Sequence, residues 1–89
     1  MSYEYQLTAK KIDFDGLAKG LAQQGYCLSS SAERLEVFED DIPIMSICPH
    51  NGGVYLAWHG GAPGTRDSLL GAVLLMNAAY NKEVVFSEL

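Results

Sequence analysis

The stretch from Val54 to Tyr80 constrains the fold more than any other part of the chain. The residue pattern over Val54–His59 predicts a strand, and the glycine-rich segment Gly60–Gly64 ends it. The run that follows has helical spacing and carries no charged residue from Ser68 to Asn81. We therefore expect a strand, a tight corner and an apolar helix at the centre of the fold.

The corner also carries the features of a helix start. Thr65 is a suitable N-cap, because its hydroxyl can accept a hydrogen bond from a free N–H of the first turn. Asp67 is then expected in the first turn, where negative charge is favourable to the helix dipole. Pro63 and Gly64 just before it suit a tight corner.

The apolar residues of this helix cover more than one side of it. One stripe contains Leu69, Val73, Met76 and Tyr80, and a second stripe beside it contains Leu70 and Leu74. Leu75 and Ala79 lie roughly opposite, with the small Gly71 and Ala78 between. This pattern predicts a homodimer through helix 65–80, because twofold symmetry is the commonest way to cover a self-complementary patch. In the alternative, an N-terminal helix containing Gly16 and Gly20 covers that side within one chain.

Hydrophobic periodicity locates the other elements. Residues 3–7 alternate as a strand, and a helix is expected from Asp13 to a stop at Gly25, with Phe14, Leu17, Ala18 and Leu21 facing the core. Further strands are expected over Tyr26–Leu28, Arg34–Phe38, Ile42–Cys48 and Glu83–Phe86, with turns at Ser29–Ser31, Glu39–Asp41 and Pro49–Gly53.

This order, β-α-β-β-β-β-α-β, predicts a single α+β domain over residues 1–89. We expect a mostly antiparallel sheet of about five or six strands with two helices on one face. The first β-α-β unit is a candidate for a right-handed parallel crossover. A ferredoxin-like variant is the alternative topology, since one extra hairpin separates the two element orders.

Charge and cysteine usage exclude several classes of function. The net charge of −5 and the pI of about 4.7 disfavour direct binding of nucleic acid or an anionic membrane but permit a basic protein partner. The apolar helix is shorter than the ~20 residues that a membrane span needs. No signal peptide is visible, and we interpret Cys27 and Cys48 as reduced thiols of a cytoplasmic protein.

Two groups of residues are candidates for ligand chemistry. Cys48, His50 and His59 flank a predicted hairpin and would suit a Cys/His nucleophile pair or a partial metal site. Their spacing fits no zinc pattern, so we predict no metal, no cofactor and no catalytic residue. The corner formed by Gly60, Gly61, Thr65 and Arg66 would place free helix N–H groups near an anion, although it lacks the Gly-Lys-Ser/Thr ending of a P-loop.

Carboxylates form the densest charge feature. Glu33, Glu36, Glu39, Asp40 and Asp41 surround Phe38, and the set predicts a binding surface for a basic protein. Tyr55 is a second candidate apolar anchor. The competing interpretation is a solvated strand face and turn.

These features predict a small acidic intracellular protein that binds another protein and inhibits or regulates it. Immunity proteins, antitoxins and phage-encoded defence blockers share this physical profile. The alternative is a small enzyme, or an anion- or nucleotide-binding domain, that uses the Gly60–Thr65 corner with His59, Arg66 and Cys48. A third possibility is a subunit of an assembly in which helix 65–80 is an internal contact.

Overall fold

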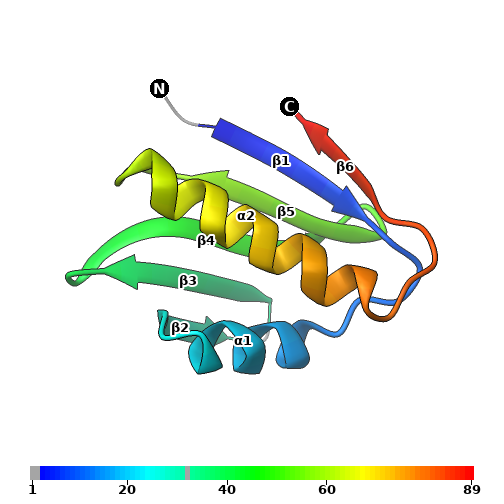
Figure 1. The fold of residues 1–89 in the computed structure, drawn as a ribbon, viewed down its shortest axis with the longest axis horizontal. Helices are drawn as coiled ribbons and strands as arrows, with labels where there is room; N and C mark the ends of the chain where they lie inside the picture. The colour runs from blue at the N-terminus through cyan, green and yellow to red at the C-terminus, as the bar shows by residue number, and fades with distance from the viewer. Residues whose placement is uncertain (1–2, 32) are drawn as a thin grey trace.

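A computed structural model describes residues 3–31 and 33–89 and shows a six-stranded sheet with both helices on one face (Figure 1). The elements in chain order are β1 Tyr3–Thr8, α1 Phe14–Gln23, β2 Cys27–Ser31, β3 Arg34–Glu39, β4 Ile42–His50, β5 Gly53–Trp58, α2 Pro63–Ala78 and β6 Val85–Glu88. The strands lie in the order β2-β3-β4-β5-β1-β6, and each neighbouring pair is antiparallel. The predicted α+β class and element order are confirmed.

Both helices connect strands that are not neighbours. α1 connects β1 to the edge strand β2, which lies beyond β5, β4 and β3, and α2 connects β5 to β6 across β1. The first β-α-β unit therefore does not join paired strands, although β1 and β2 run in the same direction. Without the β3–β4 hairpin, the remaining strands would have the order of a split β-α-β sheet, which is the topological relation to a ferredoxin-like arrangement.

The hydrophobic core lies between the sheet and the helices. The buried side chains alternate along β1, β3 and β5 and meet one face of each helix, whereas four consecutive residues of β4, Ile44 to Ile47, are buried. The most deeply buried large residues are Leu7, Leu21, Leu35, Val37, Met45, Ile47, Val54, Leu56, Leu69 and Val73. Alternation fixes one face of the sheet as interior, so the other face is left to polar residues.

α1 forms as its sequence predicts. The Asp13 side chain caps it by accepting a hydrogen bond from the Gly16 N–H at 2.9 Å. Leu17 and Leu21 are buried against the sheet. Gly25 follows the helix with a φ of 97°, a left-handed conformation that glycine adopts without a steric penalty.

α2 begins earlier than predicted. Its first residue is Pro63, whose fixed φ suits the first helical position, and Ala62 is the N-cap. Thr65 is therefore not the cap, and its hydroxyl instead donates to a Glu39 carboxylate oxygen at 3.3 Å. Asp67 lies beyond the first turn. Both predictions were wrong because the proline sets the start of the helix.

α2 is buried along a narrower face than predicted. Leu69 is fully buried, but Tyr80, expected in the same stripe, is 63% exposed. α1 packs against Met76, where the missing side chain of Gly20 provides space: an added Cβ would lie 2.8 Å from the Met76 sulfur. Leu75 stays 74% exposed, so the alternative in which α1 covers that side is wrong for Leu75. The homodimer through helix 65–80 stays a prediction.

Strand ends differ from the predicted ones where pairing extends them. Ser29–Ser31, expected in a turn, belong to β2 and pair with β3. β4 continues to His50, which shortens the following hairpin turn to Asn51–Gly52. β6 covers Val85–Glu88 rather than Glu83–Phe86, because it pairs with the second half of β1.

Candidate functional site: the uncovered face of the sheet

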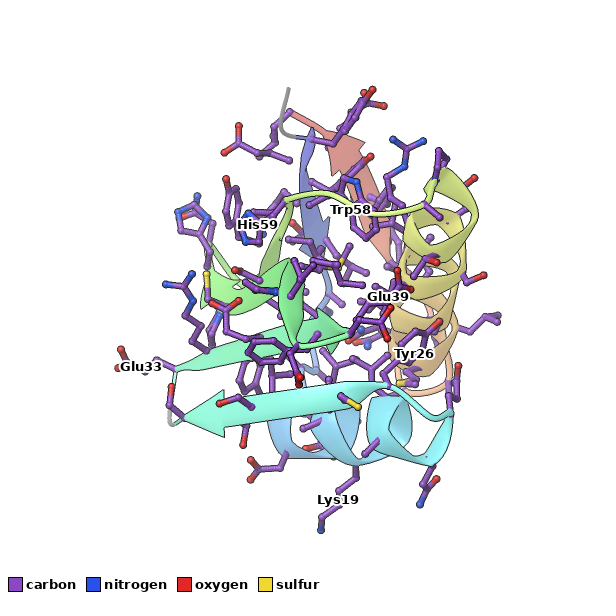
Figure 2. The ribbon with its side chains drawn as sticks, turned by 90° about the vertical axis from the view of Figure 1, so that its left-hand side faces the viewer. Lys19, Tyr26, Glu33, Glu39, Trp58 and His59 are labelled. Atoms are coloured by element: carbon purple, nitrogen blue, oxygen red, sulfur yellow. The ribbon has the colours of Figure 1, made fainter. Side chains whose placement is uncertain are left out.

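Neither helix covers the second face of the sheet (Figure 1). The register places on this face Arg34, Glu36 and Phe38 of β3, Ser46, Cys48 and His50 of β4, Tyr55 and Ala57 of β5, and Glu4, Gln6 and Thr8 of β1. Figure 2 shows that His59, just after β5, points to this side, whereas its neighbour Trp58 points toward the helices. We call this surface the open face.

A polar cluster around Ser46 occupies the centre of the open face. Ser46 is only 5% exposed. Its hydroxyl lies 2.9 and 3.0 Å from the two Glu36 carboxylate oxygens, 3.1 Å from Arg34 Nη2 and 2.6 Å from His59 Nε2. Arg34 and Glu36 also form an ion pair. Four side chains from three segments are thereby fixed relative to one another.

The hydrogen-bond donors and acceptors around Ser46 determine whether its hydroxyl can act as a nucleophile. A hydroxyl has one proton to donate and can accept two hydrogen bonds. The Arg34 guanidinium only donates, and the ionised Glu36 carboxylate only accepts, so the Ser46 proton points to Glu36 and His59 Nε2 must carry a proton directed at Ser46. A nucleophilic serine needs the opposite arrangement, in which the imidazole accepts the hydroxyl proton. The cluster is therefore a saturated polar network and not a nucleophile–base pair.

A second polar group lies at the other end of the open face. The Gln6 side chain donates to the His50 carbonyl oxygen at 2.8 Å, and its Oε1 lies 3.1 Å from His50 Nδ1. Tyr55 donates its hydroxyl to a Glu4 carboxylate oxygen, and its ring contacts the His50 ring edge-on at a centroid distance of 5.9 Å. These contacts tie β1, β5 and β4 together and hold Tyr55 in one orientation.

The residues predicted to bind a ligand do not converge on one site. Cys48 and His50 lie on the open face, and Cys48 pairs across the strands with Tyr55. His59 contacts Ser46 and not Cys48. Thr65 and Arg66 lie beyond the sheet end in α2, so the predicted set is divided between the open face and the helix layer.

The glycine corner has a structural explanation. Gly61 has a φ of 122°, and an added Cβ would lie 3.2 Å from the Trp58 ring. A side chain there would be strained and crowded, so glycine lets the chain turn closely over the buried indole. Gly60 precedes it and has open space around it.

The N-terminus of α2 already has a carboxylate beside it. Glu39 accepts a hydrogen bond from Thr65 in the first turn, and negative charge at this end of a helix is stabilising. The Thr65 and Arg66 backbone N–H groups, which an anion would need, already donate to the Ala62 carbonyl oxygen at 3.0 and 3.2 Å. Arg66 does not compensate, because its guanidinium lies 4.5 Å from the centroid of the Tyr3 ring. Burial disfavours the charged form, but the contacts with Tyr3 and Asp67 outweigh it and raise the pKa of Arg66.

The six residues predicted to bind a partner occupy separate places. Glu36 and Phe38 lie on the open face, half-buried. Glu33 precedes β3, and the Asp40–Asp41 turn follows it, so these exposed carboxylates are about 20 Å apart along a six-residue strand. Figure 2 shows Glu33 at the outer tip of this strand and Glu39 turned toward α2. The exposed carboxylates therefore form two separate groups, one at each end of β3, and not one patch.

Of the two groups, the Asp40–Asp41 turn has the unusual backbone conformation. Glu39 pairs with Ile42, so two residues close the hairpin, and both have positive φ, 51° for Asp40 and 64° for Asp41. This is the geometry of a type I′ turn, which favours Asn-Gly. The next hairpin has that favoured sequence at Asn51–Gly52, with φ values of 49° and 73°. The two hairpin turns therefore differ mainly at the second position, where one has Asp41 and the other has Gly52.

Other kinds of site find no support in the part of the chain that the structure describes. No group of three or more His, Cys, Asp or Glu residues within 3–31 and 33–89 is placed to hold a metal ion. Both cysteines are free, Cys27 exposed and Cys48 half-buried. No helix in those ranges is long and apolar enough to cross a membrane.

Comparisons with protein-family models, with curated proteins and with solved structures give no match. No residue role is therefore carried over from another protein. The function must be argued from the geometry of this chain.

Proposed function

We propose that this protein binds a basic protein partner through the open face and the Asp40–Asp41 turn, and inhibits or regulates that partner by occupying its surface. The Asp40–Asp41 turn is the observation that carries the proposal. Both aspartates are exposed and both have a left-handed backbone. A type I′ turn accepts aspartate at its first position but favours glycine at its second, so Asp41 is the strained residue, and backbone strain is typical of functional positions.

Electrostatics strengthens this argument. Glu39, Asp40 and Asp41 are consecutive carboxylates at a hairpin tip, and like charges at such spacing repel. Folding gains nothing from the second aspartate, because asparagine or glycine would suit the turn better. Binding to a basic surface would benefit from the second aspartate, because complementary charge speeds association and selects among partners.

The open face supplies the short-range contacts. Phe38 precedes the turn by two residues and Tyr55 lies across β4 from β3, and both rings are partly accessible. Aromatic residues of this kind provide much of the binding energy at interfaces. The Ser46 network fixes the charged groups between them before a partner arrives, which reduces the entropy lost on binding.

The small-enzyme alternative has less support. The proton of Ser46 points to Glu36, the predicted ligand residues are divided between two layers, and the Thr65 and Arg66 N–H groups of α2 donate to the Ala62 carbonyl. No described contact favours a particular reaction.

The test compares two double variants of equal charge. Asp40→Asn with Asp41→Gly, and the control Glu83→Gln with Glu88→Gln, each change the net charge from −5 to −3. Wild-type protein is used to capture a partner from the native host, and association rates of the purified pair are measured for all three proteins at low and high salt. We expect the turn variant to associate at least about tenfold more slowly at low salt, with a weaker salt dependence, and the control to stay within about twofold.

The turn variant should fold more stably than the wild type, so slower association cannot result from unfolding. Equal rates for the two double variants would show that the turn is not the binding element. A captured partner without a basic surface would contradict the proposed chemistry.

A further inference from the structure

The edge strand β2 lacks the usual protection against pairing with another strand. Its sequence, Cys-Leu-Ser-Ser-Ser, contains no charge and no proline, and four of its five residues are exposed. Proteins normally protect sheet edges with charges, prolines or very short strands. The other edge is protected in this way: β6 has only four residues, Glu83 precedes it, and Glu88 is its last residue.

The register identifies the backbone groups that β2 presents outward. Ser31 pairs with Arg34 across a two-residue connection, so these two residues exchange hydrogen bonds, as do Ser29 and Glu36. Hydrogen-bonded and non-hydrogen-bonded pairs alternate in an antiparallel ladder. Leu28 and Ser30 therefore direct their N–H and C=O groups away from β3.

We propose that β2 is a homodimer interface in which two copies pair antiparallel and extend the sheet across the two molecules. Of the five residues of β2, only Leu28 and Ser30 offer outward groups, so the register of these residues with the most hydrogen bonds places Leu28 of each copy opposite Ser30 of the other. This register makes four backbone hydrogen bonds and puts the twofold axis at Ser29. The strand is thus complementary to itself, as a twofold interface requires.

Charges on α1 favour a second copy over an unrelated peptide. α1 packs beside β2 (Figure 1), and the Tyr26 N–H closes the turn that joins them by donating to the Leu21 carbonyl at 3.2 Å. Figure 2 shows Lys19 pointing away from the molecule below β2, and Asp15 is exposed one helical turn before it. The twofold axis makes the two α1 helices antiparallel, so Asp15 of each copy approaches Lys19 of the other. The exposed Ala22 on the same helix leaves room for this approach.

Proline substitution tests the hydrogen bonds. Ser30→Pro removes an outward N–H but no bond to β3, and proline is tolerated in edge strands at such positions. Sedimentation velocity at protein concentrations of about 10 to 500 µM covers the dissociation constants expected for a dimer with a small interface. We expect the wild type to dimerise, Ser30→Ala to match it, and Ser30→Pro to weaken the dimer at least about tenfold, since two of four hydrogen bonds are lost.

Cysteine cross-linking tests the register and does not depend on the proline variant folding. In a Cys27→Ser background, Ser29→Cys places two thiols across the axis in a non-hydrogen-bonded pair, with Cα atoms about 4.5 Å apart, within disulfide range. Ser31→Cys is the matched control, because the two copies of residue 31 would be about 13 Å apart. Mild oxidation should link Ser29→Cys and not Ser31→Cys. Equal linking of both, or of neither, would overturn the proposal.

Two further variants separate this interface from the predicted dimer through helix 65–80. Asp15→Lys should weaken the β2 dimer about three- to tenfold, and adding Lys19→Asp should restore it. Leu75→Glu should have no effect. A dimer that Leu75→Glu dissociates and Ser30→Pro leaves intact would assign self-association to α2 and refute the β2 interface, as would a wild type that is monomeric at the highest concentration.

Discussion

Replacing Asp41 by glycine should make the protein more stable. Asp41 is exposed, ends a two-residue turn and has a φ of 64°. A left-handed conformation destabilises an L-residue by roughly 1–2 kcal/mol, and aspartate by less. Glycine avoids this strain, but its greater conformational entropy in the unfolded chain lowers the stability of the folded protein by about 0.5–1 kcal/mol. The backbone contribution is therefore a net gain of about 0.5 kcal/mol.

Charge adds a second contribution. Two unit charges about 7 Å apart in water repel by roughly 0.6 kcal/mol before screening, and Asp41 has two carboxylate neighbours. At moderate salt, a few tenths of a kcal/mol remain. The total expected gain is about 1 kcal/mol, equivalent to a rise in Tm of about 4–8 °C for a domain of this size.

A series at one position separates the two contributions. Asp41→Asn removes only the charge, because asparagine also tolerates the left-handed region. Asp41→Ala removes the charge but keeps a Cβ without any local hydrogen bonding. Urea unfolding at low and high salt should order the stabilities as Gly, Asn, Asp and then Ala, with the Asn gain shrinking in salt. Alanine as stable as glycine would show that the turn is not left-handed in solution and would remove the main support for the proposed function.

Four further substitutions test the packing. Gly53→Ala should lower the free energy of unfolding by at least about 2 kcal/mol, because the added Cβ would lie 1.8 Å from the Leu7 carbonyl oxygen. Gly71→Ala has open space around the added Cβ and should raise the free energy of unfolding by about 0.5–1 kcal/mol, as measured by denaturant unfolding. Ser46→Ala should lose about 1–3 kcal/mol by leaving its charged neighbours without the hydroxyl, and NMR of the imidazole protons should report the altered network. Leu75→Glu should change stability by less than about 0.5 kcal/mol, since Leu75 is 74% exposed; light scattering that showed a wild-type dimer and a monomeric variant would support the helix-mediated dimer.

Elements with strong local chemistry were predictable from the sequence. Asp13 and Gly25 delimit α1 because a carboxylate cap and a left-handed glycine act within one turn of chain. Asn51–Gly52 specifies its hairpin by the same kind of local preference. β2 was underpredicted because Ser29–Ser31 have no strand preference of their own and become a strand only by pairing with β3.

The Ser46 cluster was not predictable, and the reason is a single extra residue. Extending the register from the Asp40–Asp41 turn would pair Ser46 with Leu35 and place it opposite a core residue. The register shifts between Val37 and Phe38, so Ser46 pairs with Glu36. A shift of one residue exchanges the two faces of a strand, and nothing local in the sequence marks this bulge. The one available indication was a serine between buried Met45 and Ile47.

The position of β1 between β5 and β6 determines how the chain can reach its native state. β2, β3, β4 and β5 follow one another through short turns, and their contacts are local. β1 instead pairs with β5, which lies in the other half of the chain, and β6 pairs only with β1. Closing so long a loop is entropically unfavourable and slow compared with hairpin formation. During synthesis the N-terminal strand must therefore wait for β5, whose edge stays open to other strands until β1 docks and β6 can follow.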